Sequence, residues 1–171
     1  MARHLVEPAR DMIIAFIRAN IAPALAAVEA DRNAGFNYGV PLPSPREYFI
    51  SKNWLALQPP SVFVVCESGD FKKTRGANHI NATAKFGIVA VVEAQTSDVS
   101  TRMADRYIAA FSQILDNLKL TSADNTFSMK IIAQGFEFSE DYTVSTQKND
   151  AAEMWRKGFK LNCDVEFYEA L

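Results

Sequence analysis

The sequence has few of the side chains on which enzymes most often depend. Its two histidines, His4 and His79, have no cysteine or carboxylate at the spacing of a metal site. Its two cysteines, Cys66 and Cys163, are too few for a disulfide framework and lie in apolar runs, so we expect two reduced, buried thiols. No glycine-rich phosphate-binding loop and no serine-nucleophile motif occurs. We therefore expect a protein that is not an enzyme, with no catalytic residue, metal site or cofactor.

Basic charge is not in excess either. The chain has 18 lysines and arginines against 20 aspartates and glutamates, a net charge of −2 that argues against a general nucleic-acid binder. No small-residue cleavage site follows a clean apolar stretch near the N-terminus, so we expect no signal peptide. The candidate membrane segment, residues 12–28, contains Arg18, Asn20 and Pro23 and is shorter than the roughly 20 residues of a span. We expect no contact with a membrane.

Hydrophobic periodicity predicts a first helix over residues 8–30. Pro8 suits the first turn of a helix, and large apolar side chains recur at three- and four-residue steps from Met12 to Val28, with alanines between them. This helix therefore has two apolar faces, and we expect it to contact both its own core and a neighbouring subunit. Pro23 should kink the helix or begin a second short one.

A second helix is predicted over residues 98–118, with Ser97 or Asp98 as its N-cap. An apolar stripe that includes Met103, Tyr107 and Phe111 should face the core. The residues expected on the opposite, solvated face are Arg102, Asp105, Arg106 and Gln113.

The connection over residues 33–60 is rich in glycine, proline, asparagine and serine, which indicates an extended arm. Aromatic residues such as Phe36, Tyr48 and Trp54 make it too apolar for a free linker. We favour an arm that packs on its own domain over an arm exchanged with a neighbouring subunit.

Four strands are predicted. Residues 61–66 are rich in β-branched and aromatic side chains, and residues 84–95 are apolar on both faces, as in a central strand covered on both sides. Residues 127–138 form a strand with a bulge near Gly135, and residues 160–168 alternate strictly between apolar and polar. Polar loops are expected at residues 67–81 and 139–150, and a turn at residues 121–125. The result is a single α+β domain, with an antiparallel or mixed sheet of about four or more strands flanked by two main helices.

Two clusters of charged residues could carry chemistry. Glu137, Glu140 and Asp141 could suggest acid–base or divalent-cation chemistry, although a hydrated loop explains them equally well. A basic cluster of Lys72, Lys73 and Arg75 stands beside Phe71, which could suit a nucleic acid, but a solvated or protein-contacting loop is the favoured interpretation.

The order of the elements carries a resemblance. A largely apolar N-terminal helix is followed by a proline-containing stretch and then by strands 61–66 and 84–95, which a polar loop joins. Next comes a helix with the run Arg106-Tyr107-Ile108-Ala109-Ala110-Phe111, and two further strands complete the order. Over nearly the whole chain this order resembles the tail-terminator and tail-completion proteins of long-tailed bacteriophages. In that family a small sheet flanked by helices forms the domain, and six copies form a ring on the tail tube.

The resemblance implies that residues 1–171 are one such domain, in a virion protein of the tail or neck that is assembled in the host cytoplasm. Its partners would be five further copies of itself in a hexameric ring, the tail-tube protein and the head–tail connector protein. DNA would pass through the lumen without specific binding, which suits the mild net acidity. The candidate interface residues are Phe71, Lys72, Lys73, Arg75, Phe16, Arg18, Tyr48 and Trp54.

Two alternatives stay open at this stage. The chain could be another head–tail connector or neck-ring protein of the same virion. It could also be a small-molecule-binding α+β domain with a pocket beneath the arm.

The alternation in the last strand gives a first testable prediction. Phe159, Leu161, Cys163, Val165 and Phe167 should share the buried face, because side chains two residues apart lie on one side of a strand. The substitution Phe167→Ala should lower the free energy of unfolding by about 3–5 kcal/mol, measured by denaturant titration. A loss below about 1 kcal/mol would mean that the predicted register is wrong.

Overall fold

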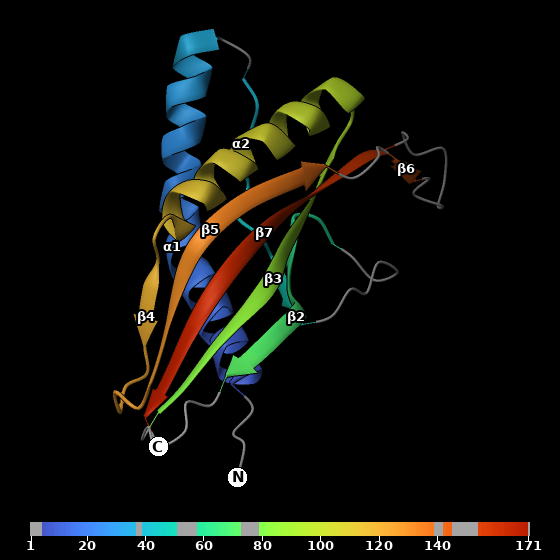
Figure 1. The fold of residues 1–171 in the computed structure, drawn as a ribbon. Helices are drawn as coiled ribbons and strands as arrows, with labels where there is room; N and C mark the ends of the chain where they lie inside the picture. The colour runs from blue at the N-terminus through green and yellow to red at the C-terminus, as the bar shows by residue number, and fades with distance from the viewer. Residues whose placement is uncertain are drawn as a thin grey trace.

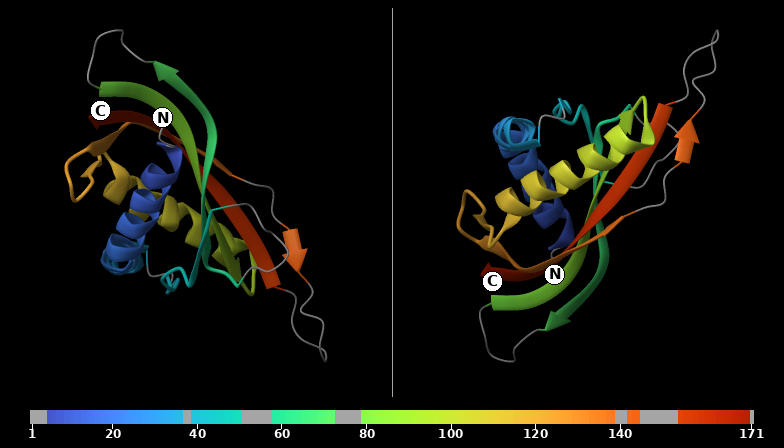
Figure 2. Two further views of the ribbon diagram at one scale, coloured as in Figure 1. Left: turned by 90° about the horizontal axis from the view of Figure 1, so that it is seen from below. Right: turned by 90° about the horizontal axis from the view of Figure 1, so that it is seen from above.

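Two helices pack on the same, inner side of one curved sheet (Figures 1 and 2). The computed structural model describes residues 5–36, 39–50, 58–72, 79–138, 142–144 and 154–170. The helices are α1 (Val6–Phe36) and α2 (Ser97–Leu115). The strands are β1 (Glu47–Phe49), β2 (Ser61–Lys72), β3 (His79–Ala94), β4 (Lys119–Thr121), β5 (Phe127–Phe138), β6 (Tyr142–Val144) and β7 (Met154–Ala170). The predicted α+β class is confirmed.

The sheet is larger than the sequence predicted. Its seven strands follow the order β1-β2-β3-β7-β5-β4, and β6 also pairs with β7. The β1–β2 pair is parallel and the other pairs are antiparallel, so the sheet is mixed. The three unpredicted strands, β1, β4 and β6, have three residues each, too few for an alternation of side chains to be recognised.

Burial confirms the predicted register of β7. Its inward-facing residues from Phe159 to Phe167 are at most 3% exposed. Central strand β3 is covered on both faces, as predicted: Phe86 and Ile88 join the main core under the helices, whereas Val89 and Val91 join a second cluster with Phe63. The second cluster explains why the middle of β3 is apolar on both sides.

Several predicted boundaries were wrong. The polar stretch after residue 66 continues β2, and β3 begins at His79, so Lys72 pairs with Asn81 in one long hairpin. The predicted bulge in β5 exists, but it lies at Ile132 rather than at Gly135, since the register shifts between Ile131 and Ala133. The ends of β2 and β3 were missed because they are polar and lack the hydrophobic pattern from which strands were predicted.

Pro23 does not end α1, which continues as one helix from Val6 to Phe36. Ile13, Ile17, Ile21 and Leu25 form the buried stripe of this helix. By length and composition alone the helix could cross a membrane. Its isoleucine and leucine stripe instead packs against the sheet and α2, as the stripe of a core helix does.

Helix α2 differs from the prediction at its N-cap and on one face. The N-cap is Thr96, whose hydroxyl accepts a hydrogen bond from the Val99 amide. Arg106, expected in solvent, is only 7% exposed. Its guanidinium donates to Asn33 Oδ1 at 2.5 Å and to the Val40 carbonyl at 3.4 Å. This buried arginine therefore joins α2 to the end of α1 and to the arm.

Of the arm predicted over residues 33–60, residues 33–36 instead belong to α1, and residues 39–50 pack against the core of the same chain. Val40 and Leu42 are buried in the main core. The Leu42 amide donates to Glu29 Oε2 at 2.8 Å, and the Tyr107 hydroxyl donates to the Pro43 carbonyl. Burial raises the pKa of Tyr107, so its hydroxyl stays protonated and can keep donating.

The contacts of Arg106 give a second prediction. Arg106→Ala would remove the hydrogen bonds to the half-buried Asn33 Oδ1 and to the Val40 carbonyl, together with a side chain only 7% exposed, and should lower the free energy of unfolding by about 2–4 kcal/mol. The matched control is Arg102→Ala on the same helix, whose ion pair with Asp98 lies at the surface at 3.1 Å and should contribute about 0.3–0.5 kcal/mol. Equal losses for the two variants, measured by denaturant titration, would show that the arm does not depend on Arg106.

Candidate interaction surface

The structure brings together two of the residues predicted for an interface. The Arg18 guanidinium lies 4.9 Å from the centre of the Tyr48 ring, which links the exposed side of α1 to β1. This cation–π contact is made within one chain, so it fixes the arm against α1. Phe16 is half-buried and packs against the main core. Arg18 and Tyr48 therefore hold the arm against α1, and of the three residues only Arg18 is exposed.

The remaining predicted interface residues belong to the hairpin end and the arm. Phe71 and Lys72 end β2, where their backbones pair with Ala82 and Asn81 of β3. Lys73, Arg75 and Trp54 lie outside the described residues. Their role at an interface stays a prediction.

The outer face of the sheet, opposite the helices, carries charged side chains that pair across strands. Lys160 Nζ lies 2.7 Å from Glu67 Oε1, and Arg156 Nε lies 2.6 Å from Glu93 Oε2. The first pair crosses over Gly87, where an added Cβ would lie 2.9 Å from atoms of both side chains. The ion pair therefore passes directly over Gly87, and a side chain at this position would force the ends of Glu67 and Lys160 to shift.

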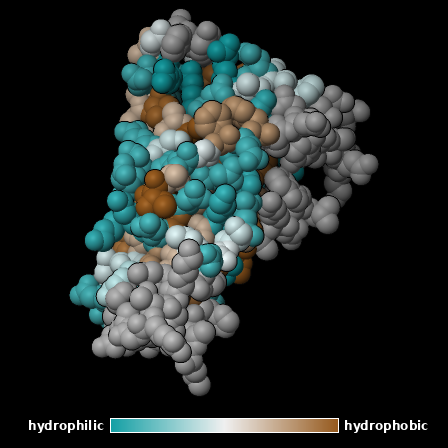
Figure 3. Space-filling model, viewed as in Figure 1, coloured by the Kyte–Doolittle hydropathy of each residue, from teal (hydrophilic) through white to brown (hydrophobic). Residues whose placement is uncertain are grey.

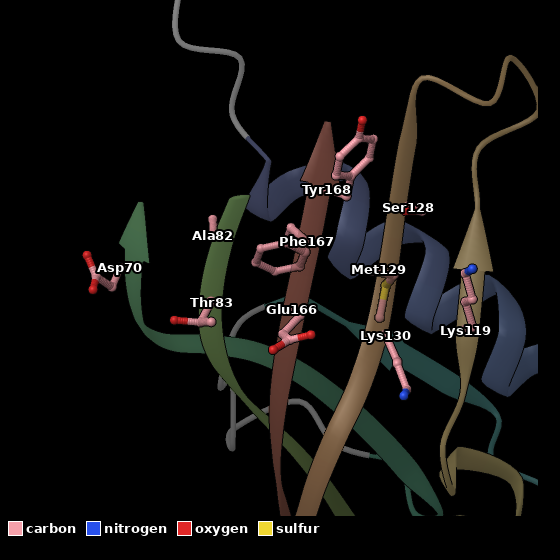
Figure 4. Close-up of a pocket in the computed structure, with 10 residues that line it drawn as sticks. All are labelled: Asp70, Ala82, Thr83, Lys119, Ser128, Met129, Lys130, Glu166, Phe167 and Tyr168. Carbon is pink, nitrogen blue, oxygen red and sulfur yellow. The ribbon is translucent and has the colours of Figure 1, made fainter. Parts of the chain in front are cut away.

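A transverse row of polar residues crosses the outer face near the hairpin end of the sheet. The strand registers align Lys119 with Lys130, Glu166, Thr83 and Asp70, one residue from each of five neighbouring strands. These residues line a hollow of about 410 Å³ (Figure 4). Its two lysines lie on the β5 side and Asp70 on the β2 side, so the charge is unevenly distributed across the sheet.

Apolar side chains are exposed along the edge of β5, and the sequence did not reveal them. Ile132, Phe136 and Phe138 are 47%, 58% and 45% exposed. The two phenylalanine rings meet edge to face at 5.7 Å, and Lys157 Nζ lies 5.5 Å from the Phe138 ring. The Phe-x-Phe pattern after Gly135 was recognised as a strand, but a local pattern does not show that α1 and α2 leave these two side chains exposed. On the face shown in Figure 3, the described residues form a mostly hydrophilic surface with separate hydrophobic patches.

Neither cysteine has an environment that would activate it. Burial raises the pKa of Cys163 to about 12 and also raises the pKa of the half-buried Cys66. Strand β3 lies between the two cysteines, so their Cα atoms are two strand spacings, or about 10 Å, apart, which is too far for a disulfide. Among the described residues, no group of three or more His, Cys, Asp and Glu side chains could hold a metal ion.

The carboxylate cluster predicted at the end of β5 is only partly described. Glu137 Oε1 accepts a hydrogen bond from Asn162 Nδ2 at 2.6 Å, across to β7. Glu140 and Asp141 lie outside the described residues. The structure thus gives Glu137 a role in cross-strand pairing on the outer face.

Comparison with known proteins gives little further information. No family model matches the chain. No curated protein matches its sequence. Among solved structures, a chain from the "Virion of native gene transfer agent (GTA) particle" is 16% identical; the match covers 88% of this chain and 94% of the other, with a TM-score of 0.33. A superposition this loose carries no weight for function, which must be inferred from the chain's own residues.

The cysteine environments give a third prediction. A thiol with a pKa of about 12 is almost entirely protonated at pH 8, so Cys163 should not react with a thiol reagent in the folded protein. We expect Cys66 to react in the folded protein and Cys163 to react only after unfolding. The number of reacted thiols in each state is measured spectroscopically. The control Cys66→Ala should remove the reaction of the folded protein. Labelling of Cys163 as fast as Cys66 would contradict the burial described above.

Proposed function

We propose that this chain is a structural protein of a tailed-phage virion that forms a ring on the tail tube and joins it to the head-side connector. The observation that carries the proposal is the order of elements along the whole chain, which resembles that of tail terminators. Its hexameric state, its contact with the tail-tube and connector proteins, and its position in the neck are parts of the same proposal.

Two features of the described residues support an assembly protein. The β5 edge presents Ile132, Phe136 and Phe138 to solvent within seven residues. Phe136 and Phe138, whose rings are in contact, form an exposed apolar pair of the kind found at interaction sites. The arm, held by Arg106 and Tyr107, keeps α1 and β1 rigid against the body. A ring subunit benefits from such rigidity, because little conformational entropy is then lost on assembly.

The outer face of the sheet suits a surface along which DNA slides. Lys160 and Arg156 are both paired with carboxylates, so they are not arranged as a stripe of phosphate-binding side chains. We therefore assign this face to a lumen through which DNA passes without specific binding. Absence of catalysis belongs to the same proposal, since a ring protein needs interfaces and no reactive groups.

The fourth prediction is the mass of the protein in solution. The full chain should form a closed ring, expected to be a hexamer, whose mass is measured by native mass spectrometry and sedimentation, alone and with tail-tube protein. Trypsin should cut at Lys72, Lys73 or Arg75 in the separated subunit and lose access in the ring. A stable monomer at every concentration would contradict the proposal. If that monomer bound a metabolite, the small-molecule-binding alternative would replace it.

A further inference from the structure

Each edge of the sheet carries a short outer strand, and the two short strands lie at opposite ends of the sheet. In the described part of the chain, β1 pairs with β2 only over Ser61–Phe63, and β4 pairs with β5 only over Ser128–Lys130. Since β2 and β5 run in opposite directions, these two short strands lie at opposite ends of the sheet. One edge therefore protrudes at β1 and recedes along the rest of β2. The other edge protrudes at β4 and recedes along the rest of β5.

The strand registers show how closely the two edges match. We call a row of residues that pair across neighbouring strands a level of the sheet. The level that includes Lys119 and Asp70 crosses β2, β3, β7, β5 and β4. The level that includes Phe49 crosses β1, β2, β3, β7 and β5. Phe49 is at one end of this row and Glu137 is at the other. The sheet is thus five strands wide at both levels. A protrusion on one edge stands at the same level as a recess on the other.

Charge also differs between the edges. On β4 and β5, Lys119 stands directly opposite Lys130, an unfavourable arrangement for two like charges in a sheet. Glu166 faces Lys130 from the other side, which leaves Lys119 as the outermost charge of this edge. At the same level on the other edge stands Asp70, which is exposed. At this row of the sheet the outermost charge is therefore positive on one edge, at Lys119, and negative on the other, at Asp70.

Both edges also have exposed apolar side chains. At the recess beside β5, Phe136 and Phe138 are exposed. The protrusion at the same level of the other edge is β1, which ends at Phe49 and is followed by Ile50, 53% exposed. The recess of one edge and the protrusion of the other thus present apolar surface at the same level.

We propose that copies of this chain join head to tail, with the β4–β5 edge of one copy seated on the β1–β2 edge of the next. This inference rests on the ring function proposed above and names the surfaces that form the ring. Lys119 then faces Asp70 of the next copy, and β1 of the next copy fills the recess beside Phe136. A contact between two unlike surfaces repeats from copy to copy and closes into a ring when the rotation allows.

A two-fold contact of like edges fits less well. It would place Lys119 near a second Lys119 and would leave the β1–β2 edge uncovered. Head-to-tail contact satisfies both edges of every copy, because the protrusions and recesses, the charges and the apolar residues are complementary between edges rather than within one. The second copy, and not an unrelated protein, is therefore the partner that the two edges fit.

The fifth prediction is a charge-reversal rescue in the full-length protein. Lys119→Glu or Asp70→Lys alone should place like charges together and weaken the ring at least about fivefold in dissociation constant, measured by sedimentation. The double variant should restore the wild-type value, because the new charges attract again. Within one copy the two residues are four strand spacings, roughly 19 Å, apart across the sheet, which exceeds the screening length at 0.15 M salt. Rescue therefore reports a contact between copies.

Matched controls use residues of the same kind away from the edges. Lys85→Glu on central strand β3 should leave the ring unchanged, and so should Tyr168→Ser on the outer face, whereas Phe136→Ser should weaken it. Each variant must first show the wild-type melting temperature, and a second reversal, Lys119→Asp, replaces Lys119→Glu if that variant unfolds. A wild-type ring that neither reversal weakens, or that the double variant does not rescue, overturns the assignment of these edges. A wild-type monomer overturns the proposed function itself.

Discussion

The pairing of β3 with β7 is the constraint on which the rest of the structure depends. The two strands align without interruption from His79 opposite Ala170 to Ala94 opposite Trp155. This ladder fixes which residues of both strands face the helices, because side chains alternate between the two faces. It also fixes the level of β2 and β5, which pair with the outer sides of β3 and β7. The inner core and the charged outer face follow from one register.

The sequence predicted those parts of the fold in which one interaction repeats. The alternation from Phe159 to Phe167 shows the burial of β7, and the two-sided apolar middle of β3 shows that it is central. Arg106 was placed wrongly because a charged residue on a helix is usually solvated. Its spacing held a signal, however: it is three residues after Met103 and four before Ala110, both of which are buried. The contact that decided its burial came from Asn33, far away in the chain.

The candidate interface could be predicted only in part. Arg18 and Tyr48 were predicted at an interface with another subunit or partner, and the structure shows them in contact with each other within the chain. The exposed side chains of β5 depend on where α2 lies over the sheet, which no local pattern reports. The charge difference between the edges depends on the register that places Lys119 level with Asp70 across five strands. Features of this kind arise from pairing between distant segments, and local periodicity does not contain them.

The shortness of β1 and β4 is what allows the two edges to fit each other. If β4 continued along β5 to Phe138, it would occupy the position that β1 of a neighbouring copy takes in the proposed ring. If β1 continued along β2 to Lys72, it would block the seat of β4 in the same way. Lengthening either strand would satisfy more backbone groups within the monomer and would close an edge to other chains. Two short strands at opposite ends thus keep both edges open in a complementary form, and the stability that longer strands would add to the monomer is left to be gained between copies.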